Sequence, residues 1–185
     1  MGSLTDVQRS IVTGKLLGDG SLRKKANTLL EINHSYKQKD YVFWLYDVFR
    51  EHVLTPPKLR VSGIKRFSYR FTTRSLSDLN SFYKEFYPNN GTKIVPQTLK
   101  LDPLSLAIWF MDDGSKTRTS VYLNTQQFCI EDQQLLLVKL KELGIVASLN
   151  KDKSYFRIRL AGSSVNTFTE YVKPNLLPSM EYKLP

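Results

Sequence analysis

Two stretches of sequence decide the fold: Val12-Thr13-Gly14-Lys15-Leu16-Leu17-Gly18-Asp19-Gly20 and Leu106-Ala107-Ile108-Trp109-Phe110-Met111-Asp112-Asp113-Gly114. In each, a largely apolar segment with helical spacing ends at an aspartate followed by glycine. Further landmarks follow both stretches in the same order, including a strand-like segment with arginine and then a lysine separated from a proline by one or two residues. This internal repetition indicates a duplication. We expect an N-terminal half over residues 1–100 and a C-terminal half over 101–185.

The secondary-structure pattern repeats as well. A capping box at Thr5 predicts a helix from Asp6 to Gly18, and Asp102 followed by Pro103 predicts the start of its counterpart, which is apolar all round and therefore central. Strand patterns and amphipathic helices follow each of the two. The expected order in each half is helix, two strands, helix, two strands, helix, which is typical of α+β architecture with antiparallel sheets.

Composition favours a polyanionic partner. Lys and Arg outnumber Asp and Glu by 27 to 17, which gives a net charge of +10, and nucleic acid is the usual partner of so basic a domain. The single cysteine, Cys129, excludes an internal disulfide and zinc-finger spacing, and we expect it to be a small core residue. No apolar run approaches the length of a membrane span, so we expect an intracellular protein without membrane contact.

Asp19 and Asp113 are the candidate catalytic residues. A helix C-terminus carries partial negative charge, so a carboxylate there is unfavourable unless something positive offsets it. We expect no lysine in the last turn of either helix to do so, which favours a hard divalent cation with oxygen ligands. An Asp-Gly step on its own is common in turns, but two in equivalent places favour a shared function.

Small residues on the first central helix bear on how the two aspartates meet. Gly14 and Gly18 are four residues apart, a spacing that permits close backbone approach between helices. The two carboxylates are then expected to share one site, where metal ions can stabilise both the attacking water and the leaving oxygen of a phosphodiester displacement. Ile108 and Asp112, at the corresponding positions of the second helix, supply such an approach less well.

Both stretches resemble the two motifs of a single-chain LAGLIDADG homing endonuclease, of the subgroup that includes the endonuclease of the yeast mitochondrial omega intron. The resemblance extends in order to Leu54-Thr55-Pro56-Pro57, Leu123-Asn124-Thr125-Gln126 and Tyr182-Lys183-Leu184-Pro185. It implies a duplicated αββαββα fold with two central helices and two antiparallel sheets that form a DNA-binding saddle. It also implies a monomeric, site-specific endonuclease that cuts both strands of a long DNA target and supports intron mobility, with an organelle-encoded (mitochondrial or chloroplast) origin.

The resemblance also assigns roles to particular positions. Asp19 and Asp113 correspond to the metal ligands of the family, joined by the backbone carbonyls of Gly18 and Asp112, while the side chain of Asp112 is not expected to bind metal. Lys93 and Lys183 correspond to lysines beside the scissile phosphates, and Asn33 and Asn124 to residues that hold water near the metals. We expect Mg²⁺, with Mn²⁺ as a substitute and Ca²⁺ binding without cleavage. Lys15 stands where the family is apolar, and we expect its side chain to reach solvent or DNA.

Basic residues along the strands and their turns are the candidate DNA contacts. Arginine can make bidentate contacts to guanine, and other basic groups contact phosphates. A solvated basic sheet face is the alternative interpretation. The candidate DNA-binding residues are Arg23, Lys24, Lys25, Lys58, Arg60, Lys65, Arg66, Arg70, Thr72, Arg74, Lys116, Arg118, Lys151, Lys153, Arg157 and Arg159.

Three other functions stay open at this stage. The first is a maturase-like role with intron RNA as partner, and the second is a non-enzymatic DNA-binding regulator on the same scaffold. The third is a restriction-type nuclease, since Glu181-Tyr182-Lys183 fits an acid-x-lysine pattern, although that pattern requires a strand and an upstream acid.

Overall fold

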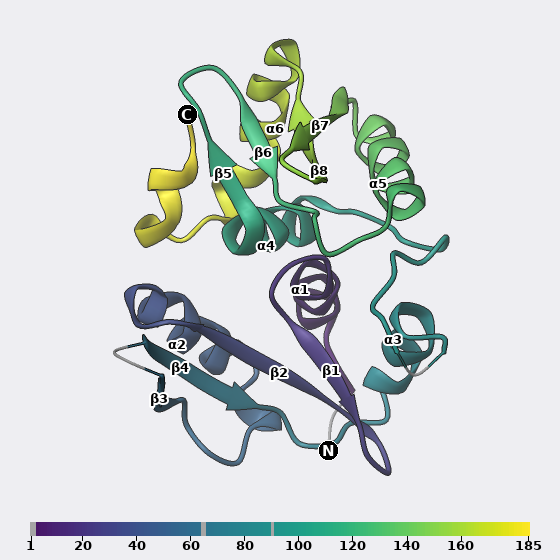
Figure 1. Cartoon of the computed structure of the whole chain (residues 1–185). Coiled ribbons are helices and arrows are strands. Elements are labelled where there is room, and N and C mark those ends of the chain that lie inside the picture. Colours follow the sequence, from purple (N-terminus) through teal and green to yellow (C-terminus); the bar gives the residue numbers. More distant parts are fainter. Residues whose placement is uncertain (1–2, 64–65, 90) are drawn as a thin grey trace.

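The computed structural model describes residues 3–63, 66–89 and 91–185, and its two sheets lie on either side of a pair of central helices (Figure 1). The first sheet has the strand order β1-β2-β4-β3 and the second β5-β6-β8-β7, and all pairings are antiparallel. The strands are β1 (Ser21–Lys24), β2 (Thr28–Ser35), β3 (Lys58–Ser62), β4 (Arg66–Thr72), β5 (Gly114–Lys116), β6 (Val121–Leu123), β7 (Ala147–Asp152) and β8 (Tyr155–Leu160). The predicted α+β class is confirmed.

The helices follow the expected order around these strands. They are α1 (Asp6–Leu17), α2 (Lys39–Val48), α3 (Leu79–Phe86), α4 (Pro103–Asp113), α5 (Ile130–Glu142) and α6 (Val165–Val172), with short 3-10 segments η1 (Tyr36–Gln38), η2 (Arg50–His52), η3 (Gly162–Ser164), η4 (Lys173–Asn175) and η5 (Pro178–Lys183). Each half of this series therefore reads αββαββα, as the sequence predicts.

Local sequence explains where the two central helices begin. The Thr5 hydroxyl accepts a hydrogen bond from the Gln8 N–H, and the Gln8 side chain accepts one from the Thr5 N–H, so α1 starts with a complete capping box. Asp102 and Ser105 form the same arrangement at α4, where Pro103 occupies the first turn. Both central helices therefore begin at a complete capping box.

The two central helices pack at unusually short range. A Cβ added at Gly14 would lie 2.4 Å from the Ser105 carbonyl oxygen and 2.6 Å from the Ile108 Cβ. One added at Gly18 would lie 2.4 Å from the Asp112 Cβ. Glycine is therefore required at both positions, and the predicted close approach occurs directly against Ile108 and Asp112.

Residue alternation in the strands separates an inner face from an outer face. Ile32 and Phe71 are paired across β2 and β4 and are buried, as are Ile158 and Leu160 on β8. Helices α2 and α3 cover the inner face of the first sheet, and α5 covers that of the second. Arginine-bearing positions of β4 and β8 consequently face outward.

Two smaller features complete the fold. Cys129 is exposed at the N-cap of α5, so the expectation that it is a core residue is wrong. Among the described residues, no helix combines the length and apolar character needed to cross a membrane.

Candidate active site

One cavity of about 500 Å³ lies at the C-terminal ends of the two central helices. Its lining comes from both halves and comprises Gly18, Asp19, Gly20, Ser21, Tyr87, Lys93, Asp113, Asn124, Gln126 and Gln127. Asp19 and Asp113 thus face the same space, although they come from segments far apart in the sequence. The Gln127 amide nitrogen bridges the two sides, because it lies 3.4 Å from the Gly18 carbonyl oxygen and 3.3 Å from the Asp113 Oδ2.

The Asp113 carboxyl has a raised pKa in this cavity. Burial, and then the negative charges of Asp19 and Asp112, raise its pKa to about 7, while Lys93 and Lys183 act in the opposite direction. A neighbouring carboxylate disfavours the charged form of an acid. The raised pKa therefore reflects burial first and the neighbouring carboxylates second.

Lys93 and Lys183 make equivalent contacts in the two halves. The Lys93 ammonium donates to the Gly18 and Gly20 carbonyls at 2.9 and 3.1 Å. The Lys183 ammonium donates to the Met111 and Asp112 carbonyls at 2.5 and 3.1 Å. Burial lowers the pKa of Lys93 to about 8 and lowers that of Lys183 as well, opposed in both cases by the nearby aspartates.

These contacts change the expected electrostatics of the helix ends. Lys93 and Lys183 bind carbonyls at the C-terminal ends of α1 and α4, the favourable place for a cation. Lys15 also lies in the last turn of α1. The expectation that no lysine lies in the last turn of either helix is therefore wrong for α1, where Lys15 lies, and correct for α4. Two of these cations are supplied by segments far along the chain, and the third was present in the motif itself.

Lys15 is fully buried, so the expectation that its side chain reaches solvent or DNA is wrong. Its ammonium lies 2.7 Å from one carboxylate oxygen of Asp112 and 2.9 Å from the other. Both side chains have no exposed surface. Two of the positions at which this chain departs from the resembling family's motifs, Lys15 and Asp112, are thus in direct contact.

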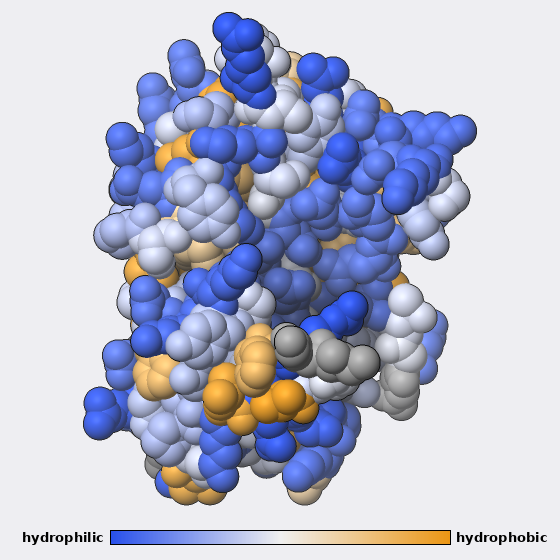
Figure 2. Space-filling view, turned by 60° about the vertical axis from the view of Figure 1, so that its left-hand side comes forward, coloured by the Kyte–Doolittle hydropathy of each residue, from blue (hydrophilic) through white to orange (hydrophobic). Residues whose placement is uncertain are grey.

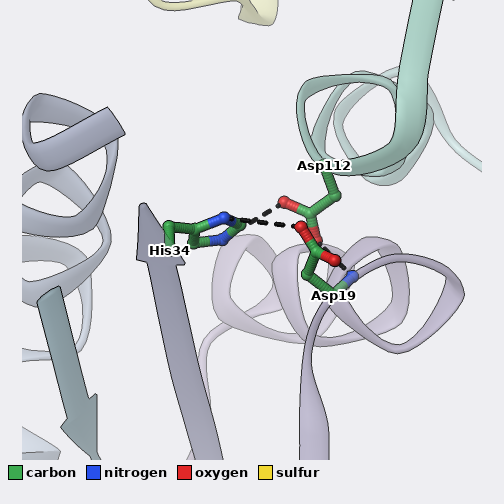
Figure 3. Close-up of side chains that lie close together, drawn as sticks. All are labelled: Asp19, His34 and Asp112. Carbon is green, nitrogen blue, oxygen red and sulfur yellow. Dashed lines mark hydrogen bonds and ion pairs between the residues drawn. The ribbon is translucent and has the colours of Figure 1, made fainter. Parts of the chain in front are cut away.

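Two further side chains, Tyr41 and His34, complete a buried polar cluster with this ion pair, and Figure 3 shows His34 and Asp112 of this cluster beside Asp19. The Tyr41 hydroxyl donates to Asp112 at 3.0 Å, and His34 Nε2 lies 2.6 Å from the Lys15 ammonium. His34 Nδ1 lies 3.5 Å from Asp19 Oδ2. Burial, and then the charge of Lys15, lower the pKa of His34 to about 3, although Asp19 and Gln38 act in the opposite direction. Burial, then the charge and hydrogen bond of Asp112, raise the pKa of Tyr41.

Asp19, His34 and Asp112 offer ligand atoms within 4.8 Å of one another, the geometry of a possible metal site. The Lys15 ammonium already contacts Asp112 and His34. A positive charge is therefore built into this cluster by the chain, and we do not interpret these three residues as a metal site.

The two asparagines predicted to lie near the metals have different surroundings. The Asn124 amide donates to the Asp113 carbonyl at 2.7 Å and lines the cavity. Asn33 is exposed on β2, opposite Arg70, and lines a different hollow beside His34.

Sequence reasoning missed His34, Tyr41 and Gln127. The signal that was available was the pair of motif departures at Lys15 and Asp112.

Most candidate DNA contacts of the first sheet gather on its outer face. A hollow of about 330 Å³ there is lined by Arg23, Lys58, Arg60, Arg70, Thr72 and Arg74, among others. The Glu31 carboxylate binds two of these, Arg23 at 3.2 Å and Arg70 at 2.5 Å. Arg66 lies beside a neighbouring hollow. Figure 2 shows that hydrophilic residues cover most of the face that it presents.

The second sheet has a smaller basic outer face. Arg157 and Arg159 flank the Tyr122 ring, with guanidinium carbons 4.3 and 6.0 Å from its centroid. Arg157 also lies 3.7 Å from the Asp152 carboxylate. The shared outer position of Tyr155, Arg157 and Arg159 agrees with the pairing register of β8.

The remaining basic candidates lie away from these two faces or in turns. Lys24 donates to Asn80 at 2.8 Å and Lys116 donates to the Leu184 carbonyl, so both are engaged within the fold. Lys151 is exposed on β7, and Lys25, Arg118 and Lys153 are exposed in turns. Lys65 lies outside the residues that the structure describes.

Comparison with protein families decides the assignment. The sequence model of the family described as the LAGLIDADG DNA endonuclease family matches residues 9–168, which include both stretches with their aspartates. The chain belongs to the LAGLIDADG DNA endonuclease family. The resemblance seen in the sequence is confirmed. The restriction-type alternative is also wrong on structural grounds, because Glu181-Tyr182-Lys183 lies in the 3-10 segment η5 and not in a strand.

Individual LAGLIDADG relatives match nearly the whole chain. It is 30% identical over 196 residues to the cytochrome b mRNA maturase bI2 of Saccharomyces cerevisiae, covering 95% of this chain and 46% of the maturase. The chain thus spans just under half the length of that relative. It is 29% identical over 201 residues to the probable intron-encoded endonuclease 1 of Wickerhamomyces canadensis, covering 98% and 85% of the two chains.

A solved LAGLIDADG structure agrees closely with the fold. The homing endonuclease I-WcaI bound to its DNA recognition sequence superposes with a TM-score of 0.93 at 27% sequence identity. The match covers 100% of this chain and 88% of that one. The structure therefore has the fold of a DNA endonuclease over its full described length.

Proposed function

We propose that this LAGLIDADG chain is a site-specific homing endonuclease that hydrolyses phosphodiester bonds in both strands of a long double-stranded DNA target and depends on a divalent metal. The observation that carries the proposal is the shared cavity of Asp19 and Asp113, each at the end of one central helix. In this proposal residues 1–100 and 101–185 each read one half-site, and the protein acts as a monomer.

The residues at the cavity fit Mg²⁺. Mg²⁺ prefers oxygen ligands and keeps waters in its coordination sphere, and the cavity offers the carboxylates of Asp19 and Asp113. The proposed further ligands are the backbone carbonyls of Gly18 and Asp112, which also accept hydrogen bonds from Lys93 and Lys183. The pKa of Asp113 is raised first by burial and then by the charges of Asp19 and Asp112, and a bound cation would oppose that rise. When bound, such an ion supplies Lewis-acid stabilisation and activates water. Mn²⁺ is the proposed substitute, and Ca²⁺ is expected to bind without supporting cleavage.

Lys93 and Lys183 are the proposed partners of the scissile phosphates. Each is held at a helix end by carbonyl contacts, so each ammonium is positioned before DNA binds. A preorganised cation beside the cavity stabilises the negative charge that develops on phosphate oxygens. Asn124 and Gln127 are proposed to orient water there, because their amides lie on the Asp113 side of the same space.

The two outer sheet faces are the proposed DNA-binding saddle. The structure of I-WcaI with its recognition sequence, at 27% identity, supports this use of the shared fold. The proposed base contacts are Arg23, Arg70 and Arg157. The Glu31 carboxylate holds the first two guanidinium groups on the outer face, and the Tyr122 ring holds that of Arg157. Basic groups in turns are assigned to phosphates, which position the protein without reading sequence.

A second function, intron RNA maturation, is favoured by one observation. The relative in Saccharomyces cerevisiae is named a cytochrome b mRNA maturase, and the chain aligns with just under half of it. The relative in Wickerhamomyces canadensis is named an intron-encoded endonuclease. These two names support an intron-encoded, organelle origin and a role in intron mobility. Accelerated splicing of an intron transcript by the cavity variants described next would favour the maturase function.

Selection of cleaved molecules from a randomised duplex library with Mg²⁺ tests the endonuclease directly. The selected target is then cut with Asp19→Asn and Asp113→Asn, which keep shape but remove a charged ligand. Both variants should lose cleavage and retain target binding. Asp47→Asn is the matched control, because Asp47 is an exposed carboxylate on α2 and does not line the cavity. Undiminished cutting by either cavity variant would overturn the proposed mechanism.

A further inference from the structure

A buried polar cluster of Lys15, His34, Tyr41 and Asp112 adjoins the active site but does not line its cavity. We propose that this cluster is a positioning device for Asp19, held together by the complementary departures at Lys15 and Asp112. The inference rests on the proposed endonuclease function and deepens it. It assigns a role to four side chains that do not line the cavity.

The first contact of the cluster with Asp19 is through the main chain. Asp112 Oδ2 accepts a hydrogen bond from the Asp19 N–H at 3.0 Å. Asp19 follows directly on the Gly18 cap of α1, so this bond ties its backbone to α4 of the other half. An alanine at position 112, as in the resembling family, has no acceptor for that N–H.

The second contact is with the Asp19 side chain. Lysine ammonium is a donor only, so the 2.6 Å contact of Lys15 requires His34 Nε2 to be the acceptor. The ring proton then resides on Nδ1, which faces Asp19 Oδ2 at 3.5 Å (Figure 3). Lys15 thereby selects the histidine tautomer that directs an N–H at the Asp19 carboxylate. The Gln38 side chain, the Tyr41 ring and Asp112 Oδ1 also lie close to this ring.

Lys15 also determines whether Asp112 stays charged in the interior. The Asp112 carboxylate has contacts with Lys15, Tyr41 and the Asp19 N–H, and its side chain has no exposed surface. A buried charge is tolerated when it is paired and its remaining lone pairs are hydrogen-bonded. Removal of Lys15 alone would leave that negative charge uncompensated beside Asp19 and Asp113.

The cluster treats the two aspartates unequally. Within residues 3–63, 66–89 and 91–185, no hydrogen bond or ion pair joins Lys15, His34 or Tyr41 to Asp113. Asp113 is contacted instead by Gln127 and, through its carbonyl, by Asn124. Loss of the cluster should therefore displace one carboxylate and slow cleavage of one DNA strand more than the other.

The first test restores the family pattern with Lys15→Leu/Asp112→Ala. Apolar replacement of a whole buried ion pair is often neutral for stability, so the double variant should fold. Single-turnover cleavage is followed with a separate label on each strand of the selected target. We expect unchanged target affinity and one strand cut about 10-fold to 100-fold more slowly, the range that follows from a displacement of about 1 Å. Equal rate losses on both strands, or none, would overturn the inference.

The second test separates the two nitrogens of His34. His34→Asn places an amide near the former Nδ1 and retains a donor toward Asp19, whereas His34→Gln reaches the Nε2 position and retains only the contact with Lys15. The glutamine variant should shift the ratio of strand rates and accumulate nicked DNA, and the asparagine variant should shift it less. Identical ratios for the two variants would contradict the assigned tautomer.

The outcomes distinguish the inference from the proposed function. Wild-type protein that cuts neither strand in Mg²⁺ would overturn the endonuclease proposal and this inference with it. Wild-type cleavage together with unchanged strand ratios in Lys15→Leu/Asp112→Ala and His34→Gln would overturn the inference alone. A changed ratio with preserved target affinity would support both.

Discussion

The Lys15 ammonium and the Asp112 carboxylate form an ion pair of 2.7 Å between the two central helices, and neither side chain has exposed surface. Such a pair contributes little net stability in general, because the loss of solvation opposes the Coulomb attraction. Removal of only one member lowers the free energy of unfolding strongly, since the remaining charge then stays buried without a partner.

Single substitutions at this pair should therefore be costly and the double one mild. We expect Lys15→Leu or Asp112→Ala alone to lower the free energy of unfolding by about 3–5 kcal/mol. The double variant should lie close to wild type. Urea denaturation of all four proteins gives the coupling energy. The surface pair Asp47–Arg50, 3.8 Å apart, is the control, and its cycle should give a coupling energy of at most about 1 kcal/mol. Additive losses at Lys15 and Asp112 would contradict the buried ion pair.

Close helix packing predicts a strong effect of one added methyl group. Gly14→Ala would place a Cβ 2.4 Å from the Ser105 carbonyl oxygen, so α1 and α4 must move apart. Overpacking of this kind costs about 1–3 kcal/mol or more. Gly162→Ala is the matched control, because nothing lies within 4 Å of its added Cβ, and a change within about 0.5 kcal/mol is expected there. Thermal unfolding compares the two, and equal melting temperatures would contradict the packing.

The two positioned lysines should matter for chemistry more than for affinity. We expect Lys93→Met and Lys183→Met each to reduce the single-turnover cleavage rate, by up to about 10²–10³-fold, as for the loss of one preorganised donor. Lys141→Met is the control, since Lys141 is an exposed lysine on α5. Target binding in Ca²⁺ measures affinity separately. A cleavage rate equal to wild type in both variants would exclude the proposed role.

The pKa of Asp113 predicts how stability varies with pH in metal-free protein. The folded-state pKa is about 7, above the value of 3.8 for a free side chain, so the folded protein binds the proton more tightly. Stability should therefore fall as pH rises from about 4 to about 7. Asp113→Asn should flatten that fall, and Asp47→Asn should not. Chemical denaturation with a chelator present measures it, and a stability that rises through this window because of Asp113 would contradict the raised pKa.

A basic saddle predicts salt-sensitive DNA binding. The logarithm of the association constant should fall by about 0.9 per phosphate neutralised for each unit of log salt concentration. Arg70→Ala should weaken binding and change target preference, because Arg70 is held on the outer face by Glu31. Lys151→Ala, an exposed turn-side position, should weaken binding to all targets alike. Fluorescence anisotropy across a salt series measures both, and a flat salt response would contradict the saddle.

The sequence predicted the features that depend on local chemistry and repetition. The caps at Thr5 and Asp102, the period of two in β8 and the matched Asp-Gly steps are each encoded within a few residues. Together they were sufficient for the duplicated α+β order. Asp19, Asp113, Lys93 and Asn124, which line the cavity, were also nominated from their equivalent places or from family resemblance.

Features that depend on packing between distant segments were not predicted. Lys15 looked like a surface residue, because its partner Asp112 is 97 positions away and meets it only when the glycines bring α1 and α4 together. His34 is next to Asn33 in sequence, but strand alternation turns it inward and the asparagine outward. Lys24 similarly falls on the face that meets Asn80 and not on the outer face of its neighbour Arg23.

The contact of Lys15 with Asp112 restricts which halves of LAGLIDADG proteins can be combined in a chimaera. A hybrid that joins residues 1–100 of this chain to the second half of a relative with alanine at the equivalent of position 112 would enclose a lone ammonium group. The reciprocal hybrid would enclose a lone carboxylate. Half-site specificities can therefore be recombined only when the hybrid contains both members of this charge pair, or when both are first replaced by apolar residues.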